Sequence, residues 1–399
     1  MPKLTVDQLD LAGKRVFLRV DLNVPLEAGR VAEDTRIRAV LPTIEHCHKA
    51  GASVILASHL GRPKGAVDPR YSLKPVAVRL EELLGRPVPL LPDCVGPEVE
   101  AAAAALKPGE TVLLENLRFH PGEEANDPEF ARRLAALADV YVNDAFAAAH
   151  RAHASTEGIT RFLQPAAAGL LMARELEALG RIFEGPERPV AAVLGGAKVS
   201  DKLALVEHLL ARVDTLLIGG GMAFTFLAAL GYGVGRSLLE AERLEAARAI
   251  LGRARSLGVR MRLPVDVVAA SAPDSAEGIR TVGVREIPDD LMGLDVGPLT
   301  VVQFGAALQG AKSVVWNGPM GVFEKPAFAA GTLGLARAVA GCGAFSVIGG
   351  GDTIAAVRQA GVTDRIGYIS TGGGAFLEFL EGKTLPAVEI LEARAKETA

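Results

Sequence analysis

The chain has 399 residues, and at about 150 residues per domain this length predicts two or three domains. Hydrophobic residues make up 49% and charged residues 23%, with a net charge of −4, which excludes a disordered chain and gives no support for a nucleic-acid partner. The three cysteines form no CxxC pair, which excludes a disulfide scaffold and a thiolate zinc site and is typical of a reducing cytosol. The charged N-terminus and the lack of long apolar runs predict a cytoplasmic chain without a signal peptide or a membrane span.

Eight short apolar runs predict strands that are buried on both faces of a parallel sheet. The runs of the first half are Arg15–Val20, Ser53–Ala57, Thr111–Leu114 and Val140–Val142. Those of the second half are Val190–Leu194, Thr215–Ile218, Ser313–Trp316 and Ala344–Ile348. The stretches between them have helical patterns, for example Pro128–Leu137, Asp201–Arg212 and Leu238–Leu257. This alternation predicts an α/β fold, and because one sheet rarely absorbs so many units, it predicts two doubly wound, parallel-sheet, Rossmann-like domains.

The boundary between these domains is predicted at Glu184–Pro189, where two prolines and a glycine follow the amphipathic stretch Met172–Phe183. An ordinary loop between a helix and a strand is the alternative. We therefore expect a bilobal chain with four parts. They are an N-terminal domain (1–171), an interdomain helix and hinge (172–189), a C-terminal domain (190–385), and a helical tail (386–399) that could cap either domain.

Polar and basic side chains follow each predicted strand of the first half. Asp21 and Asn23 follow the first strand, and histidines and arginines follow the others, in the segments 58–62, 116–120 and 150–153. Ligands bind beyond the carboxyl ends of the strands in parallel α/β sheets. A single arginine there is best explained by an ion pair with a surface carboxylate, but repetition after strand upon strand predicts a small, highly anionic metabolite.

Glycine clusters follow the predicted strands of the second half, in the segments 195–196, 219–221, 349–351 and 372–374. Glycine between a strand and a helix exposes backbone N–H groups, to which the helix dipole attracts phosphate. Lys198 and Lys202 lie four apart at a predicted helix start, where they could share a face and reach one polyphosphate. Asp352 opens a helix after three glycines, where it could cap that helix or hold Mg²⁺ on a nucleotide.

Common nucleotide-binding and hydrolase motifs are absent. The single GKT sequence, Gly382–Thr384, has Leu377 where a P-loop needs its first glycine, and no GxGxxG, HExxH or GxSxG occurs.

Nine segments of the chain resemble the phosphoglycerate kinase family, in the family's order and over almost the whole length. They are RVDLNVPL (19–26), SHLGRPKG (58–65), NLRF (116–119), HRAHAS (150–155), LGGAKVSDK (194–202), LDVGP (294–298), WNGPMGVFE (316–324), GGGDT (349–353) and STGGGAFLE (370–378). The resemblance implies a monomeric bilobal enzyme of glycolysis. Such an enzyme reversibly transfers a phosphoryl group between 1,3-bisphosphoglycerate and ADP with the help of Mg²⁺, with 3-phosphoglycerate and ATP as its small-molecule partners.

The resemblance also assigns residues to each role. The phosphoglycerate site would comprise Asp21, Leu22, Asn23, Arg36, His59, Leu60, Gly61, Arg62, Arg118 and Arg151. The nucleotide site would comprise Lys198, Lys202, Gly293, Asn317, Glu324, Gly350, Gly351, Asp352 and Thr353, with Asp352 as the Mg²⁺ contact. The phosphoryl group in flight would be stabilised by Arg36, Lys198 and the backbone at Gly372 and Gly373.

Four positions depart from the family pattern: Leu22 replaces a usual Phe, Ala147 and Ala148 a frequent Gly-Thr, and Phe376 a usual Ser. Two alternatives stay open. One is a bilobal kinase for another small carboxylate, and the other is a bilobal binding protein without catalysis.

Overall fold

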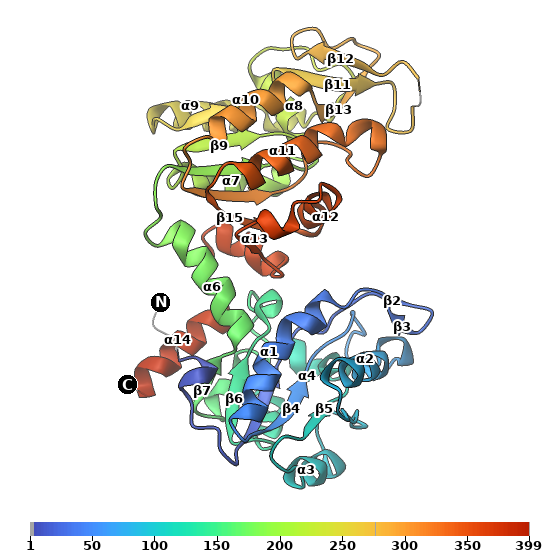
Figure 1. The fold of residues 1–399 in the computed structure, drawn as a ribbon, viewed down its shortest axis with the longest axis vertical. Coiled ribbons are helices and arrows are strands. Elements are labelled where there is room, and N and C mark those ends of the chain that lie inside the picture. Colours follow the sequence, from blue (N-terminus) through green and yellow to red (C-terminus); the bar gives the residue numbers. More distant parts are fainter. Residues whose placement is uncertain (1–3, 276, 399) are drawn as a thin grey trace. The chain divides into compact units, whose positions relative to one another are not determined.

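The computed structural model describes residues 4–275 and 277–398, which fold into two compact units (Figure 1). Unit 1 comprises the residues up to Leu176 together with those from Thr384 onward, and unit 2 runs from Glu177 to Lys383. The long helix α6 (Leu170–Phe183) carries the chain from one unit into the other.

Unit 1 is built on a five-stranded sheet of order β5-β4-β1-β6-β7, in which all neighbouring strands are parallel. Its strands are β1 (Arg15–Arg19), β4 (Ser53–Ala57), β5 (Thr111–Leu113), β6 (Val140–Asn143) and β7 (Ala166–Ala168). The chain moves outward from β1 to β5 and then returns to β6 on the other side of β1. The loops after β1 and β6 therefore diverge, and ligands of parallel α/β sheets bind at such a switch point.

Helices and a small hairpin surround this sheet. They are β2 (Leu26–Glu27), β3 (Arg30–Val31), α1 (Thr35–Lys49), α2 (Lys74–Leu84), α3 (Pro97–Ala104), α4 (Pro121–Glu124), α5 (Pro128–Ala135) and α14 (Pro386–Thr398). Helices α1 and α2 share one apolar core with Val16 and Leu18 of β1. Because side chains alternate along a strand, Phe17 and Arg19 point to the opposite face, where Phe17 meets Tyr141 of β6.

Unit 2 contains a six-stranded parallel sheet of order β10-β9-β8-β14-β15-β16, which has its switch point between β8 and β14. The strands are β8 (Val190–Leu194), β9 (Thr215–Ile218), β10 (Arg260–Arg262), β14 (Ser313–Asn317), β15 (Phe345–Gly349) and β16 (Tyr368–Ile369). The helices are α7 (Leu203–Leu210), α8 (Met222–Ala229), α9 (Leu244–Ser256), α10 (Pro298–Leu308), α11 (Ala330–Gly341), α12 (Gly351–Gln359) and α13 (Gly374–Leu380).

The predicted fold class is confirmed, since each of the eight apolar runs forms a strand of one of the two parallel sheets. The sequence analysis missed a three-stranded antiparallel sheet in unit 2, of order β12-β11-β13. It consists of β11 (Asp266–Ala270), β12 (Arg280–Gly283) and β13 (Met292–Val296). Its edge strand β12 is half exposed and polar, so it lacks the fully apolar pattern by which the other strands were found.

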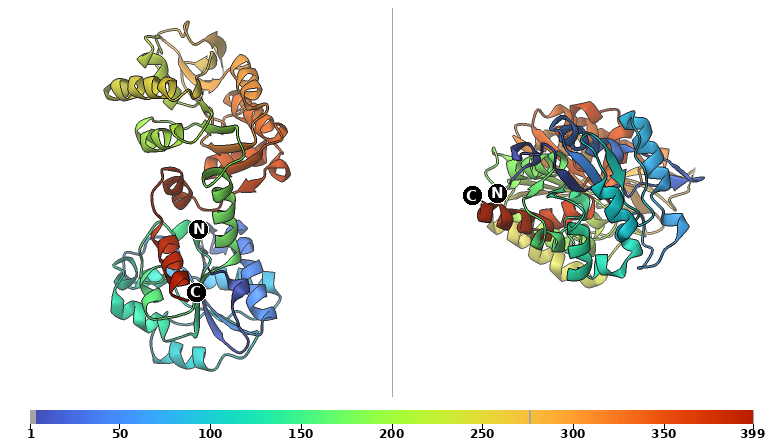
Figure 2. Two further views of the ribbon diagram at one scale, coloured as in Figure 1. Left: turned by 90° about the vertical axis from the view of Figure 1, so that its left-hand side faces the viewer. Right: turned by 90° about the horizontal axis from the view of Figure 1, so that it is seen from below.

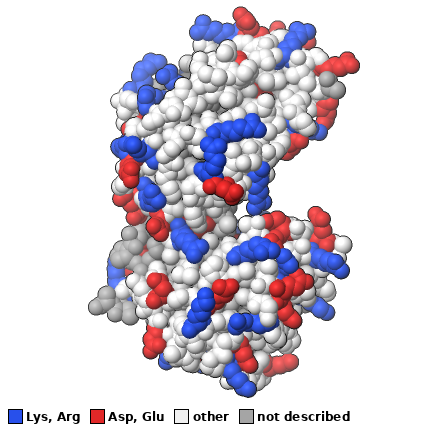
Figure 3. All heavy atoms as spheres, in the orientation of Figure 1, with Lys and Arg blue, Asp and Glu red and all other residues white. Residues whose placement is uncertain are grey.

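Helix α14 lies beside β7 in unit 1, although the whole of unit 2 separates them in the sequence (Figure 2). Segment 184–189, the predicted hinge, follows α6 and precedes β8. None of the helices within residues 4–275 and 277–398 has the length and apolar character needed to cross a membrane. On the face drawn in Figure 3, basic and acidic side chains are interspersed over both units.

Candidate functional site

The residues after β1 meet the start of α1 at the carboxyl edge of the unit 1 sheet. Arg36, in the first turn of α1, places Nη1 3.0 Å from Oδ2 of Asp21 and donates to the carbonyl oxygen of Asn23 at 2.9 Å. The side-chain oxygen of Asn23 in turn accepts the N–H of Gly61 at 2.9 Å. The loop after β1, the start of α1 and the loop after β4 are thus held together by residues that the sequence predicted as a substrate site.

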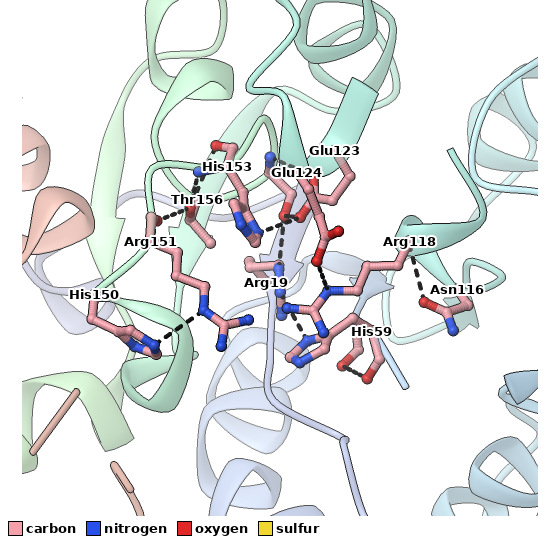
Figure 4. A network of polar contacts seen from close by, with 12 residues as sticks. Arg19, His59, Asn116, Arg118, Glu123, Glu124, His150, Arg151, His153 and Thr156 are labelled. Carbon is pink, nitrogen blue, oxygen red and sulfur yellow. Dashed lines mark hydrogen bonds and ion pairs between the residues drawn. The ribbon is translucent and has the colours of Figure 1, made fainter. Parts of the chain in front are cut away.

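Arg118 and Arg151 extend this cluster. Arg118 follows β5, is only 4% exposed, donates to the carbonyl oxygen of Gly61 at 2.8 Å and lies 3.1 Å from the carboxylate of Glu124. Arg151 donates through Nε to His150 at 3.1 Å. In Figure 4 both guanidinium groups are drawn on the side of the view where His59 lies, that of Arg118 next to the His59 ring. Burial lowers the pKa of Arg118, and the positive charges of Arg151 and Arg19 lower it as well.

His59 is buried among these cations and is therefore a neutral imidazole. Burial, together with Arg19, Arg118, Arg151 and His153, holds the pKa of His59 well below its usual value. Burial, the same three arginines and His150 lower the pKa of His153 to about 3. The positive charge of this region is therefore carried by arginines, and the neutral ring of His59 contacts Arg19 through Nδ1 at 3.2 Å.

Three further predicted residues differ in how they could meet a ligand. The side chains of Leu22 and Leu60 lie in the apolar core, so only their backbone can face a substrate. Arg62 is exposed and has no hydrogen bond or ion pair within the described part of the chain, which leaves its guanidinium free for a ligand.

The sequence analysis missed a buried network beneath the cluster, in which Arg19 contacts Ser155 and Ser155 contacts Glu123. A signal was present: Arg19 stands between Leu18 and Val20 in an otherwise apolar buried strand. A cation at such a position needs a specific partner.

Unit 2 holds a cavity of about 410 Å³ at the carboxyl edge of its parallel sheet. Three of the predicted nucleotide residues line it: Gly293, Glu324 and Asp352. Its apolar lining was not predicted and includes Phe224, Leu238, Pro273 and Met292. A Cβ at position 293 would lie 2.2 Å from the ring of Phe224, so glycine there is what lets this ring form a wall of the cavity.

The glycine clusters after β8 and β9 serve packing, contrary to their predicted role in phosphate binding. The N–H groups of Gly195 and Gly196 donate to the carbonyl oxygens of Asn317 and Pro319, and that of Gly219 donates to Leu194. A Cβ at Gly195 would lie 2.0 Å from the oxygen of Pro319. These glycines therefore let loops pack backbone against backbone.

The starts of α12 and α13 lie at the other two glycine clusters, and no side chain caps them. Their N-cap residues are Gly350 and Gly373. The first N–H groups of a helix have no partner within it, so these two starts offer donors to an anion. The ring of Phe376, one of the departures from the family pattern, is buried against Gly349 beneath the second start.

Lys202, Asn317 and Thr353 are connected at the ends of β14 and β15. The ammonium group of Lys202 donates to the side-chain oxygen of Asn317, whose amide donates to the carbonyl oxygen of Gly349 at 2.8 Å. The hydroxyl of Thr353 accepts the N–H of Gly318 at 2.7 Å. Burial lowers the pKa of Lys202 to about 8.

One suggested arrangement is wrong here, and one of the two roles left open for Asp352 is excluded. Lys198 and Lys202 do not share a helix face, because α7 begins only at Leu203 and Lys198 lies in the loop after β8. Asp352 does not cap α12, because the N-cap is Gly350 and Asp352 lies in the first turn. Its exposed carboxylate makes no hydrogen bond or ion pair with other described residues and faces the cavity, which suits an oxygen ligand of Mg²⁺.

Asp93, Cys94 and His120 of unit 1 form the one cluster of three metal-ligating side chains within residues 4–275 and 277–398. Their donor atoms lie within 4.8 Å of one another. His120 Nε2 and Asp93 Oδ1 are 2.7 Å apart, so these two groups satisfy each other. Burial and the carboxylates raise the pKa of the Cys94 thiol well above its usual value. The cluster shares no residue with the predicted magnesium site, and its sulfur ligand does not suit that ion.

Fold and site together define a class of protein: two Rossmann-like units, one with a cluster of arginines at its sheet edge and one with a largely apolar cavity lined in part by glycines. A family model described as phosphoglycerate kinase matches residues 6–383. The phosphoglycerate kinase of Moorella thermoacetica is 60% identical over 391 residues, which cover 98% of this chain and 99% of that protein.

Comparison with solved structures leads to the same family. The phosphoglycerate kinase from Coxiella burnetii has a TM-score of 0.92 at 45% identity, and that from Pyrococcus horikoshii OT3 has 0.82 at 35%. Each comparison covers 99% of this chain and 100% of the other. The chain belongs to the phosphoglycerate kinase family, as the sequence segments indicated, and its reaction is phosphoryl transfer between ATP and the carboxylate of 3-phosphoglycerate. This membership decides against the two alternatives that the sequence left open.

Asp295 of β13 lines the cavity of unit 2 and provides a pH-sensitive support for it. Its carboxyl group is 3% exposed and accepts the N–H of Gly331, at the start of α11, at 2.6 Å. Burial raises its pKa to about 7. In the unfolded chain the pKa of an aspartate is about 3.9. Between this pH and pH 7 the folded state therefore binds more protons than the unfolded state. The stabilisation from this proton is present at low pH and is lost as the pH rises through 7.

We therefore expect Asp295→Asn to flatten this pH dependence. Relative to the wild type, the variant should gain about 2–4 kcal/mol of unfolding free energy between pH 4 and pH 7.5. Urea unfolding of both proteins across this range measures the difference. The exposed Asp290→Asn serves as control and should follow the wild type. Parallel curves for the wild type and Asp295→Asn would show that Asp295 does not titrate there.

Proposed function

We propose that the arginine cluster of unit 1 binds 3-phosphoglycerate and that the cavity of unit 2 binds ATP or ADP. The observation that carries this assignment is the convergence of Arg36, His59, Arg118 and Arg151 at the carboxyl edge of one parallel sheet. Arginine forks donate two parallel hydrogen bonds to a phosphate or a carboxylate, and phosphoglycerate carries one of each. Asp21 can only accept and suits the hydroxyl group of this substrate.

The acceptor chemistry explains why the site needs no general base. The attacking group is a carboxylate, which is already ionised at pH 7. The barrier then lies in bringing this anion up to the polyanionic γ-phosphoryl group, so catalysis rests on positioning and on neutralisation of charge.

In unit 2 we assign the apolar walls of the cavity to the nucleotide base. Glu324 accepts from ribose hydroxyl groups. The phosphates would bind at the start of α12, formed by Gly350, Gly351, Asp352 and Thr353, with Lys202 and Asn317 beside it. Support comes from the position of Glu324 and Asp352 on the lining of a single cavity.

The Mg²⁺ ion that accompanies a nucleotide would be held by Asp352 and by phosphate oxygens. The fit rests on an exposed carboxylate without a protein partner, which is the kind of ligand that Mg²⁺ takes in phosphoryl-transfer sites. When bound, the ion neutralises part of the phosphate charge. For the phosphoryl group in flight we propose Arg36, Lys198 and the N–H groups at Gly372 and Gly373.

We also propose that the enzyme works as a cytoplasmic monomer. The free thiols of Cys47, Cys94 and Cys342 fit a reducing compartment. Sedimentation analysis of the purified protein tests the oligomeric state.

Arg36→Ala should lower kcat about 10²- to 10⁴-fold while weakening phosphoglycerate binding far less, because it removes a charge that acts in the transition state. Steady-state kinetics with binding titrations separate the two effects. Arg38→Ala is the matched control: it lies on the same helix, pairs with Asp34, and should leave kcat nearly unchanged. An Arg36 variant that keeps more than half of the wild-type kcat rules out the assignment.

Asp352→Asn should raise the Mg²⁺ concentration needed for half-maximal rate and lower kcat, with phosphoglycerate binding intact. The amide keeps the size of the side chain but loses the charge that holds the cation. Rates measured over a magnesium titration test this, with the exposed Asp364→Asn as control. An unchanged magnesium requirement would exclude Asp352 as the ion's ligand.

Segment 184–189 is proposed as a hinge, since phosphoryl transfer requires the acceptor oxygen to come within about 3–3.5 Å of phosphorus. We expect the radius of gyration in solution scattering to fall most when nucleotide and phosphoglycerate are both bound, because each alone contacts one unit. The same radius in the free enzyme and the ternary complex would contradict the hinge.

A further inference from the structure

The hydrogen-bond network beneath the arginine cluster determines which atoms of the network carry protons. Arg19 is 1% exposed, and each of its guanidinium nitrogens has a partner: Nε donates to the hydroxyl of Ser155 at 2.8 Å, Nη1 to the carbonyl oxygen of Val20, and Nη2 lies 3.2 Å from Nδ1 of His59. Figure 4 shows Arg19 between Glu123 and His59. Because a guanidinium only donates, every partner must present a lone pair.

Glu123 forms the other end of this hydrogen-bond network. It is fully buried and accepts both the hydroxyl of Ser155, at 2.6 Å, and its N–H, at 3.0 Å. The hydroxyl proton of Ser155 therefore points to Glu123, and its lone pair points to Arg19. Burial raises the pKa of Glu123, while Arg19 and Ser155 oppose this shift. Arg19 is thus held by a serine that has only one orientation available.

This network determines which nitrogen of His59 carries the proton. Its Nδ1 faces an N–H of Arg19 and cannot itself carry a proton, so the neutral ring must carry its proton on Nε2. A charged imidazolium would aim a second N–H at the guanidinium and is excluded for the same reason. The charged and titratable groups around the ring, Arg19, Arg118, Arg151 and His153, all disfavour a further proton on it.

We propose that Arg19, anchored by Ser155 and Glu123, is a positioning residue that locks His59 in its Nε2–H tautomer, so that the ring meets the substrate as a neutral hydrogen-bond donor. This rests on the proposed role of His59 in binding phosphoglycerate. An anionic substrate needs a donor, whereas the other tautomer would present a lone pair to it. The arginines attract the anion, and the locked imidazole adds a directed hydrogen bond.

The tautomer can be read directly. In long-range ¹H–¹⁵N correlation spectra of the ligand-free full chain, we expect a pyridine-like Nδ1 and a protonated Nε2 for His59, assigned by comparison with His59→Gln. Arg19→Lys keeps the charge but loses the fork that serves Ser155 and His59 together, so both tautomers should be populated. Ser155→Ala, a smaller change, should act in the same direction. Arg15→Lys, on the same strand but paired with Asp139, is the control and should leave the His59 signals unchanged.

Kinetics give the second readout. Arg19→Lys should raise the KM for 3-phosphoglycerate about tenfold, with kcat and the KM for ATP within about twofold, since one hydrogen bond to a charged ligand is lost in unit 1 alone. His59→Gln, whose amide nitrogen can replace Nε2–H, should retain affinity better than His59→Asn. In the His59→Gln background, Arg19→Lys should raise this KM much less, because the ring it positions is gone.

A protonated Nδ1 in the wild type overturns the proposal. So does a folded Arg19→Lys or Ser155→Ala protein whose tautomer matches the wild type. If the tautomer follows Arg19 but neither His59 variant changes the KM for phosphoglycerate, the positioning by Arg19 stands and the proposed contact of His59 with substrate fails.

Discussion

The gathering of four arginines at one sheet edge is the constraint on which the site of unit 1 depends. Arg19, Arg36, Arg118 and Arg151 converge on one edge of a sheet, where partial burial strengthens their electrostatic interaction. Three of them are balanced by carboxylates: Arg36 by Asp21, Arg118 by Glu124, and Arg19 by Glu123 through Ser155. These pairs hold the cluster together without ligand, and they also set the direction in which each guanidinium can donate.

Unit 2 offers an anion a different set of hydrogen-bond donors from the arginines of unit 1. Its cavity is largely apolar, and the donors at its edge are backbone N–H groups at the starts of α12 and α13, with Lys202 as a partly buried cation. Backbone donors bring no full charges that repel one another, so this unit needs few balancing carboxylates. This difference matches the ligands proposed for the two units: phosphoglycerate is a small, highly charged molecule, whereas a nucleotide also has an apolar base and a ribose.

Both units use the same topological device. Each sheet reverses its strand order beside its first strand, β1 or β8, and the loops that leave these strands carry Asp21 and Asn23 in one unit and Gly195 and Gly196 in the other. In unit 1 these loop residues contact Arg36 and Gly61 directly. In unit 2 the glycines allow neighbouring loops to pack so closely that the cavity forms beside them.

The sequence by itself determined the fold class and eight strands of the two parallel sheets, because runs such as Val190–Leu194 and Ser53–Ala57 are short, apolar and separated by helical patterns, as strands buried on both faces are. It also determined which residue types gather at each sheet edge, since the carboxyl ends of parallel strands must lie together.

Only the tertiary structure decided how those residues are used. That Asp352 lies inside the first turn of α12, that Lys198 stands outside a helix, and that the glycines after β8 pack loops depend on where helices begin and backbones cross. The role of Arg19 depends on Ser155 and Glu123, which are distant in sequence and come within hydrogen-bonding reach only when the sheet has formed. Contacts of this kind have no local pattern, because a hydrogen bond is decided by positions in space and not by spacing along the chain.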